Sequence, residues 1–236
     1  RGKSQEERGY TYSYDMLGEA ARTDADAQRY YQAYSDAIDS ISKRCKGDVR
    51  TNPGISVKLS ALLARYEYGH KERVMNELMP RALKLARKAA AANMGFNIDA
   101  EEQDRLDLSL DVIEAILSDP ELKDWQGFGV VVQAFGKRAS QTLDWLYALS
   151  EKLDRRIMVR LVKGAYWDAE IKRAQVMGLS DFPVFTRKAC SDVAYLAGAR
   201  KLLAMTDRIY PQFATHNAHS VSAVLELAKD LSRDKF

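Results

Sequence analysis

The pattern of apolar and polar positions divides the chain into repeating units. Apolar segments of strand length recur, and each is followed by a stretch in which apolar residues return every three or four positions. The strand-like segments are residues 10–17, 54–62, 95–100, 127–135, 157–162 and 209–214. Helical spacing follows in residues 27–41, 70–92, 106–117, 143–153, 187–203 and 220–231, with a further helical segment beginning near Asp168. The pattern predicts β-then-α alternation, six times over.

Local signals refine some of these boundaries. Thr23 and Asp26 have the spacing of a capping box at the start of the first helix. Pro80 lies inside the second helical segment, where a proline ends or kinks a helix. The polar residues 1–9 indicate a lead-in loop, and residues 178–183 indicate a loop before the helix at 187–203.

Strict alternation of strands and helices indicates a parallel sheet with helical crossovers. A doubly wound sheet and a (βα)₈ barrel both fit, but polar residues end almost every strand, as at the mouth of a barrel. The fold class expected is therefore α/β, a distorted TIM-type barrel of which about six βα units are visible. A closed barrel needs eight units, so two are missing or lie beyond Phe236. The chain begins at Arg1 without methionine, and we expect residues 1–236 to be a piece of a longer polypeptide.

Composition narrows the class of protein only slightly. The 236 residues are 46% hydrophobic and 29% charged, which is typical of a globular domain. A formal charge of +3 without a basic cluster does not favour nucleic-acid binding. No apolar run approaches the ~20 residues that a membrane span needs. Cys45 and Cys190 are isolated, so we interpret both as reduced bystanders in a cytosolic-type compartment.

The most informative stretch is RRIMVRLVKGAYW, residues 155–167. Arg160 interrupts an apolar, β-branched run, and Lys163-Gly164 is followed at once by Tyr166 and Trp167. Cations and aromatic residues at the end of a buried strand are costly unless they bind something. The alternative is an edge strand with solvated cations.

Polar residues at the other strand ends support a binding site. They share a position at or next to the carboxyl end of a predicted strand: Lys58, Asp99, Gln133, Arg160, Lys163, Thr215, His216 and Asn217. Each alone has an ordinary explanation, such as a solvated lysine, a helix cap, a core amide or a structural histidine. Together they predict one mouth, at which Lys58, Asp99, Gln133, Arg160 and Thr215 lie around a ligand.

Three chemistries fit such a mouth. Lys58 or Lys163 could form a Schiff base as in an aldolase, which requires a lysine pKa lowered by burial. Asp99, Glu101, His216 and His219 could hold a metal, although no His-x-His pair is present. Arg160, Gln133 and Lys163 could serve a flavin, and the absence of GxGxxG after the first strand argues against a Rossmann site. A non-catalytic barrel fragment that only binds a ligand is a further alternative.

Several strings carry a resemblance to a known family: YSYDMLGEA, GISVKLSAL, NIDAEE, VVVQAF, RLVKGAYWDAEIKRAQ, FPVFTRK and YPQFATHNAH. In these the chain resembles, over essentially its whole length, the proline dehydrogenase domain of bacterial bifunctional proline utilization A. The resemblance implies an FAD-dependent barrel that oxidises L-proline to pyrroline-5-carboxylate by hydride transfer from proline C5 to flavin N5. It also implies a quinone or other electron acceptor and a partner dehydrogenase domain in the same longer polypeptide. We expect a cytoplasmic protein, peripheral to the membrane when reduced, that binds no nucleic acid through this domain.

The resemblance also implies roles for individual residues. Arg160 matches the arginine beside flavin N5, Lys58 the lysine beside the bound proline, and Tyr166 an aromatic wall of the pocket, with Asp99 as the fourth catalytic candidate. The cofactor-binding candidates are Asp99, Ala100, Val131, Gln133, Arg160, Val162, Lys163, Gly164, Ala165, Trp167, Thr186, Arg187, Lys188, Thr215, His216 and Asn217. No metal is expected.

Two departures from the family pattern concern the substrate side. Leu63-Ala64 stands where the family usually has His-Pro, which affects a local loop. The family's last two units supply a leucine, a tyrosine and a pair of arginines that clamp the substrate carboxylate. Nothing after Asn217 matches them, so we expect this chain alone to leave its barrel open.

Overall fold

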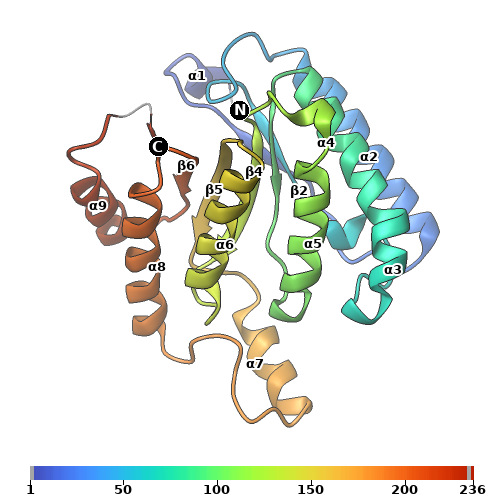
Figure 1. Cartoon of the computed structure of the whole chain (residues 1–236), viewed down its shortest axis with the longest axis vertical. Helices are drawn as coiled ribbons and strands as arrows, with labels where there is room; N and C mark the ends of the chain where they lie inside the picture. The colour runs from blue at the N-terminus through green and yellow to red at the C-terminus, as the bar shows by residue number, and fades with distance from the viewer. Residues whose placement is uncertain (1–2, 233–234) are drawn as a thin grey trace. The chain divides into compact units, whose positions relative to one another are not determined.

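The computed structural model describes residues 3–232 and 235–236, which form two compact units (Figure 1). The first unit comprises residues 1–99 and 107–129, and the second comprises residues 100–106 and 130–236. The strands form a six-stranded sheet in the order β1-β2-β3-β4-β5-β6. β4 (Phe128–Gln133) begins in the first unit and ends in the second. The α/β alternation expected from the sequence is confirmed.

The first unit contains three short parallel strands and the helices that cover them. Its strands are β1 (Ser13–Asp15), β2 (Gly54–Val57) and β3 (Gly95–Ile98). Its α-helices are α1 (Lys3–Glu6), α2 (Asp24–Ser42), α3 (Lys71–Arg73), α4 (Met79–Ala91) and, apart from its first residue, α5 (Leu106–Leu117). 3₁₀ turns occupy Leu59–Ala61, Tyr68–His70 and Pro120–Leu122, and a π-helical turn occupies Val74–Leu78. α2 and α4 pack side by side (Figure 1).

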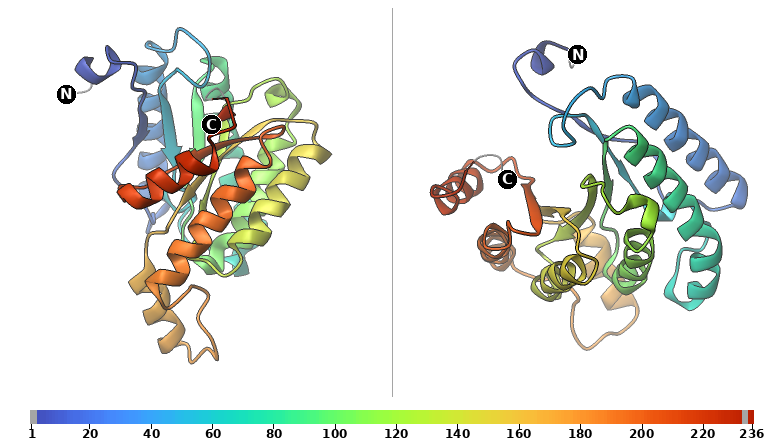
Figure 2. Two further views of the ribbon diagram at one scale, coloured as in Figure 1. Left: turned by 90° about the vertical axis from the view of Figure 1, so that its left-hand side faces the viewer. Right: turned by 45° about the horizontal axis from the view of Figure 1, so that its top comes forward.

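The second unit continues the alternation around β5 (Ile157–Val162) and β6 (Ile209–Phe213), which pair in parallel. Its α-helices are α6 (Ala139–Lys152), α7 (Trp167–Val176), α8 (Lys188–Leu203) and α9 (Ala218–Leu227). A 3₁₀ turn at Gln103–Arg105 lies in the segment after β3. α8 packs against β5 and β6 and also contacts α6 and α9 (Figure 2).

Side-chain alternation gives β5 two different faces. Ile157, Val159 and Leu161 are 0–1% exposed. Leu161 packs closely against α8, as shown by Gly198 of that helix, where an added Cβ would lie only 3.2 Å from the Leu161 side chain. The intervening positions, which include Arg160, project to the other side of the strand. The helices thus cover the apolar face of β5, and the arginine is on the opposite face.

The same alternation of side chains along a strand places several polar residues of the first unit on one face of the sheet. Asp15, Ser56 and Asn97 occupy one row across β1, β2 and β3. Lys58 and Asp99 lie two residues beyond Ser56 and Asn97, so all five positions share one face of the sheet. Ser56 and Asn97 are each 2% exposed, so this face of the sheet carries polar side chains at buried positions within the strands as well as at their ends.

Some predicted boundaries are wrong, for identifiable reasons. Residues 1–9 were expected to be a loop, but α1 occupies Lys3–Glu6, and residues 1 and 2 lie outside the described part of the chain. The strand expected over residues 54–62 ends at Val57, because the apolar run continues into a buried 3₁₀ turn. The strand expected over 10–17 is reduced to Ser13–Asp15.

The helix expected over residues 70–92 is divided into several segments. A 3₁₀ turn, α3 and a π-helical turn precede α4, and Pro80 falls in the first turn of α4, where its missing N–H costs little. The capping box is confirmed, since the Thr23 hydroxyl accepts from Asp26 N–H and the Asp26 carboxylate accepts from Thr23 N–H. Within the part of the chain that is described, no helix has the length and apolar character required to cross a membrane.

Candidate functional site

In the first unit, Lys58 is held between two carboxylates. Its ammonium Nζ lies 2.8 Å from Asp15 Oδ1 and 3.0 Å from Asp99 Oδ2. The three residues end or directly follow β1, β2 and β3, and parallel pairing brings these ends to one edge of the sheet. Lys58 and Asp99, two of the candidates from the sequence, therefore form an ion pair. Asp15 is an additional partner that the sequence analysis missed.

The charge state of Lys58 follows from this arrangement. Burial, which leaves its side chain 13% exposed, lowers the pKa of the ammonium, but the carboxylates of Asp15 and Asp99 outweigh that effect. The net result is a raised pKa, so Lys58 is a stable cation near neutral pH. A Schiff-base nucleophile needs the opposite shift, because only the neutral amine attacks a carbonyl carbon.

In the second unit, two of the candidate binding residues lie on strands: Arg160 on β5 and Gln133 at the end of β4. Arg160 is half-buried on β5, and its Nε–H donates to Gln212 Oε1 on β6 at 3.2 Å. Gln133 ends β4 and is 4% exposed. Its amide nitrogen donates to the Glu101 carbonyl and its amide oxygen accepts from Ala165 N–H, both at 2.8 Å. An amide has two donors and two lone pairs, so Gln133 keeps capacity for further bonds.

The turn after β5 has a backbone that few residues tolerate. Gly164 has φ +141°, and a Cβ there would lie 2.5 Å from the Phe135 ring. Tyr166 has φ +66°, in the left-handed region, and precedes α7 without capping it through its side chain. Such a conformation costs roughly 1–3 kcal/mol and is found disproportionately at ligand sites.

Cations gather where β5 ends and α8 begins. Lys163 Nζ lies 2.5 Å from Asp192 Oδ1, and Lys188 Nζ lies 2.6 Å from Asp192 Oδ2. Thr186, Arg187 and Lys188 are exposed, and the Arg187 side chain makes no capping bond to the α8 N-terminus. The N–H groups of a helix's first turn favour an anion, and the surrounding lysines and arginine have the same preference.

The loop that carries Thr186 is anchored to the rest of the second unit. Phe185 N–H donates to the Phe135 carbonyl at 2.8 Å, and Lys137 N–H donates to the Pro183 carbonyl at 3.0 Å. Trp167 Nε1–H donates to the Phe185 carbonyl at 2.9 Å, while 39% of the Trp167 side chain stays exposed. The indole is therefore fixed at its nitrogen and open on its surface.

Most of the remaining candidates lie at or just beyond strand ends. Thr215 and Asn217 follow β6, where Asn217 caps α9 by accepting from Ser220 N–H at 3.0 Å. His216 is exposed. Half-buried candidates include Val131 on β4, Val162 on β5 and Ala100 after β3.

Sequence reasoning missed a buried carboxylate in the second unit. Glu170 on α7 is 3% exposed, and its Oε1 accepts from Gln103 N–H at 2.6 Å. Arg138 Nη2 donates to the Gln103 carbonyl at 2.8 Å, so the segment after β3 is held from two elements. Burial raises the pKa of the Glu170 carboxyl, with Asp104 and Glu102 adding to the effect. The sequence gives no sign that Glu170 holds this segment, because its hydrogen bond joins residues that lie 67 positions apart in the chain.

Substitution of Glu170 should separate its hydrogen bond from its charge. Glu170→Ala leaves the buried Gln103 N–H without its acceptor, so we expect the free energy of unfolding to fall by about 1–3 kcal/mol. Glu170→Gln keeps an oxygen acceptor and removes the charge. Because the folded-state pKa of Glu170 is raised, wild-type stability should increase as pH falls through that pKa toward the ordinary glutamate value of 4.5, and the Gln variant should lack that component. Urea denaturation of all three proteins across this range measures both effects; equal midpoints for the Ala and Gln variants would contradict the assignment.

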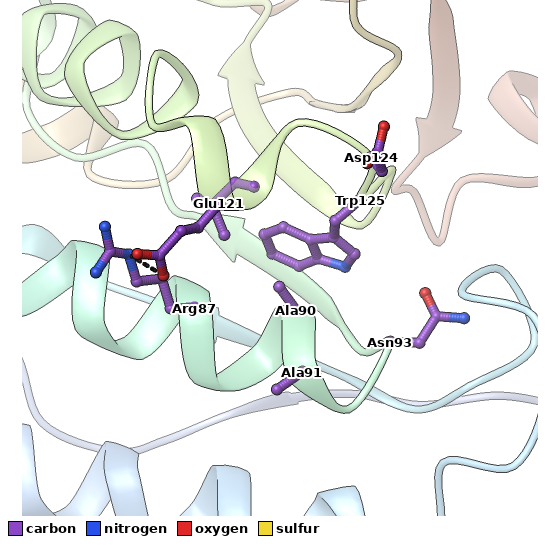
Figure 3. A pocket seen from close by; sticks show the side chains of 8 residues that line it. Arg87, Ala90, Ala91, Asn93, Glu121, Asp124 and Trp125 are labelled. Carbon is purple, nitrogen blue, oxygen red and sulfur yellow. Dashed lines mark ion pairs between the residues drawn. The ribbon is translucent and has the colours of Figure 1, made fainter.

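A separate pocket lies in the first unit at the opposite strand ends (Figure 3). Its volume is about 500 Å³, and Arg87, Ala90, Asn93, Glu121 and Trp125 are among its lining residues. Figure 3 shows the Trp125 ring above Ala90 and Ala91, with the Arg87–Glu121 ion pair beside it. Asn93 and Trp125 precede β3 and β4, whereas the candidate site residues end or follow strands. The pocket is therefore distinct from the candidate site.

The described residues contain no group of three or more His, Cys, Asp and Glu side chains arranged to hold a metal ion. The structure instead presents cations and amide groups at strand ends: Lys58 with two carboxylates in the first unit, and Arg160, Gln133 and the Lys163–Lys188 pair in the second. Such residues recognise anionic and hydrogen-bonding ligands. They belong to an α/β protein in which each unit, taken by itself, carries polar side chains at the carboxyl ends of parallel strands.

Comparison with known proteins identifies the family. The family model described as proline dehydrogenase matches residues 1–236. The bifunctional protein PutA of Escherichia coli K12 is 54% identical over 224 residues, or 94% of this chain and 17% of PutA. The PutA of Rhizobium meliloti is 52% identical over 238 residues, covering 100% of this chain and 19% of that protein. The chain belongs to the proline dehydrogenase family.

Solved structures agree with the sequence comparison. A crystal structure of proline utilization A from Bradyrhizobium japonicum superposes with a TM-score of 0.92 at 57% identity, covering 96% of this chain and 24% of that one. Proline utilization A from Bdellovibrio bacteriovorus, inactivated by N-propargylglycine, gives 0.90 at 29% identity, covering 97% and 25%. The fold matches the proline dehydrogenase domain of these proteins, a TIM-type barrel, and the chain spans 17–25% of the length of the four relatives described here.

Proposed function

We propose that the chain is an FAD-dependent catalytic region that oxidises L-proline to pyrroline-5-carboxylate. The observation that carries the proposal is Arg160, a guanidinium held half-buried on β5 within a chain that matches the proline dehydrogenase family throughout. A fixed cation in a sheltered site is suited to a reaction that builds negative charge on a ligand.

The residues of the second unit fit FAD. Lys163, Lys188, Arg187 and the uncapped N-terminus of α8 provide donors and positive charge for a diphosphate. Gln133 has amide groups with remaining capacity, and Arg160 supplies a cation, which together suit a ring with carbonyl and ring-nitrogen acceptors. Ala100, Val131, Val162, Gly164, Ala165, Trp167, Thr186, Thr215, His216 and Asn217 are proposed to complete the cofactor site.

When bound, FAD supplies the hydride acceptor. Proline gives up the C5 hydride, its nitrogen loses a proton, and the C5–N double bond of pyrroline-5-carboxylate forms. Arg160 would hold its positive charge beside the bound ring before the reaction begins, and would there stabilise negative charge that develops.

The first unit contributes the charge that suits an amino acid. The raised pKa of Lys58 keeps it a cation near neutral pH, and the proposal gives it the task of orienting proline while it compensates the charge of Asp99. Tyr166 is proposed as an aromatic wall for the proline ring, which would explain why its left-handed backbone is tolerated.

The wider setting is proposed from the relatives. PutA proteins are described as bifunctional, and this chain spans 17–19% of two of them, so we propose a pyrroline-5-carboxylate dehydrogenase domain in the same polypeptide. A membrane quinone or another acceptor would reoxidise the flavin. The protein would then be cytoplasmic and peripheral to the membrane when reduced.

Anaerobic titration of the FAD-loaded protein with L-proline tests the proposal. We expect the visible flavin absorption band to bleach with L-proline and to persist with D-proline, because hydride transfer requires C5 of a correctly oriented ring. Retention of the band at saturating L-proline would refute the proposed transfer of hydride from proline to the flavin. Failure of the folded protein to bind FAD would refute the cofactor assignment.

The Schiff-base alternative is disfavoured by the raised pKa of Lys58. Borohydride treatment in the presence of a carbonyl substrate should therefore leave no covalent adduct on Lys58 or Lys163. A trapped adduct in a protein that binds no flavin would favour the aldolase.

A further inference from the structure

Glu170 is a buried carboxyl group that the proposed reaction does not use. It lies on α7 and is 3% exposed, and its Oε1 accepts from Gln103 N–H at 2.6 Å. A carboxyl group is costly to bury, so its place in the interior of the second unit requires a reason. The hydrogen bonds around it supply one, because they lead to the candidate cofactor residue Gln133.

Gln103 depends on Glu170 for the hydrogen bond of its backbone N–H. It is the first residue of a 3₁₀ turn, so this N–H has no acceptor within the turn, and Glu102 before it makes no side-chain cap. Glu170 provides the acceptor from another element, and Arg138 Nη2 donates to the Gln103 carbonyl at 2.8 Å. The Gln103 side chain packs against Gly136, where an added Cβ would lie 2.7 Å from Gln103 Oε1. The backbone at Gln103 is therefore fixed from both sides.

Glu101, two residues before Gln103, transmits this placement to Gln133. The Glu101 carbonyl accepts from Gln133 Nε2, and Gln133 Oε1 accepts from Ala165 N–H, both at 2.8 Å. A carbonyl can only accept and a backbone N–H can only donate, so the two neighbours determine where the amide nitrogen and the amide oxygen lie. The orientation of the Gln133 amide thus depends on the position of the Glu101 carbonyl.

The backbone of α7 connects Glu170 to the other partner of the amide. Glu170 N–H donates to the Tyr166 carbonyl at 3.0 Å, and Tyr166 directly follows Ala165, whose N–H donates to the Gln133 oxygen. Glu170 is therefore linked to both neighbours of the Gln133 amide, to one through its side chain and to the other through its helix. Its carboxyl group closes a ring of hydrogen bonds that includes this amide.

We propose that Glu170 is a positioning residue for the flavin site. Its carboxyl oxygen holds the segment after β3 so that the Glu101 carbonyl orients the Gln133 amide, which then presents its second N–H and its second lone pair in fixed directions. Glu170 is not assigned any contact with FAD or proline. The inference rests on the proposed function in one step, the assignment of Gln133 to the flavin ring.

Amide hydrogen exchange tests the ring in the full chain without FAD. Glu170→Ala removes the acceptor of Gln103 N–H, and we expect Ala165 N–H to exchange roughly fivefold to tenfold faster, because the amide oxygen that protects it is no longer held in place. Phe135 N–H donates to the Lys163 carbonyl at 2.8 Å, in the same turn but outside the ring. It should exchange at the wild-type rate.

Three further variants separate the ring from a general loosening of the fold. Glu170→Gln retains an oxygen acceptor and should keep exchange at Ala165 within about twofold of wild type. Gln103→Pro removes the donor instead, at a first-turn position where proline fits, and should reproduce the effect of Glu170→Ala even if that variant does not fold. Asp168→Ala removes an exposed carboxylate from the same helix and should have no effect.

FAD affinity tests the link to the cofactor. Gln133→Leu removes the amide and should raise the FAD dissociation constant, and Glu170→Ala should raise it roughly fivefold to tenfold. In a Gln133→Leu background, Glu170→Ala should have no further effect on this constant, since there is no amide left to orient. A purely structural role would instead give additive losses.

The outcomes distinguish this inference from the proposed function. Wild-type exchange at Ala165 in both Glu170→Ala and Gln103→Pro, an equal acceleration at Phe135, or additive losses in the cycle would each overturn the positioning role and leave the proposed function standing. Wild-type FAD affinity in Gln133→Leu would overturn the assignment of Gln133 to the flavin, and with it the premise of the inference.

Discussion

Replacement of Arg160 with methionine is expected to lower kcat/KM for L-proline by about 10²–10³-fold, or roughly 3–4 kcal/mol of transition-state stabilisation. Methionine has a similar length and fills the space of the arginine stem, but it provides no charge for the flavin ring. The loss should fall mainly on kcat, because the interaction strengthens as hydride arrives. Stopped-flow reduction of the bound flavin by proline measures this step directly.

Arg160→Lys is the matched control for this experiment. A lysine keeps a positive charge but has no planar fork and no Nε to meet Gln212, so an intermediate rate is expected. The flavin content of each purified variant must be measured, because weaker retention of FAD is also expected when the cation is lost. If Arg160→Met loads FAD and reduces it within about threefold of the wild-type rate, the loss predicted for a preorganised charge is absent and Arg160 has another role.

The sequence was most informative where local chemistry determines the structure. β5 begins and ends where predicted, at Ile157 and Val162, because a β-branched apolar run is bounded by polar residues and a glycine turn. The Thr23–Asp26 capping box formed for the same reason, since its partners are three residues apart. Asp99, the first residue beyond β3, could also be located from the sequence, because it ends an apolar segment. Lys58 was selected as a charged residue in an apolar run that was predicted to continue as a strand to Leu62.

Predictions from apolar patterning failed where a strand runs into another buried element. Residues 54–62 are nearly all buried, yet only the first four form a strand, because a buried 3₁₀ turn has the same hydrophobicity as a buried strand. The first strand was predicted to extend to Leu17, so Asp15 seemed interior and was overlooked. With the observed end at Asp15, the strand-end rule that selected Asp99 would also have selected Asp15.

Partners that are distant in sequence could not be predicted at all. Gln212 lies 52 residues from Arg160, and their contact depends on the register of β5 against β6. Glu170 lies 67 residues from Gln103. One residue of register shift would turn Gln212 to the opposite face of the sheet, so no spacing rule in the sequence encodes the pair.

Replacement of Lys58 with methionine is expected to reduce stability and substrate binding together. The ammonium lies between Asp15 and Asp99 with a side chain that is 13% exposed, and its removal leaves two carboxylates that share one edge of the sheet without the cation between them. Loss of one partner of a fully buried ion pair costs about 3–5 kcal/mol. Asp15 is 58% exposed, so water screens part of the effect, and we expect a loss of roughly 2 kcal/mol in the free energy of unfolding.

The pH dependence of that difference provides the sharper test. Because the folded-state pKa of Lys58 is raised above the ordinary 10.5, its stabilisation should be constant at neutral pH and decline only as pH rises above 10.5 toward the folded-state value. Urea midpoints of wild type and Lys58→Met, compared at each pH, cancel the titration of the groups they share. Lys71→Met is the control, since Lys71 pairs with Asp111 on the surface and should change the midpoint far less. A difference between wild type and Lys58→Met that already disappears near pH 8 would mean that Lys58 loses its proton there, which would favour a Schiff-base role for Lys58 that its two carboxylate partners now disfavour.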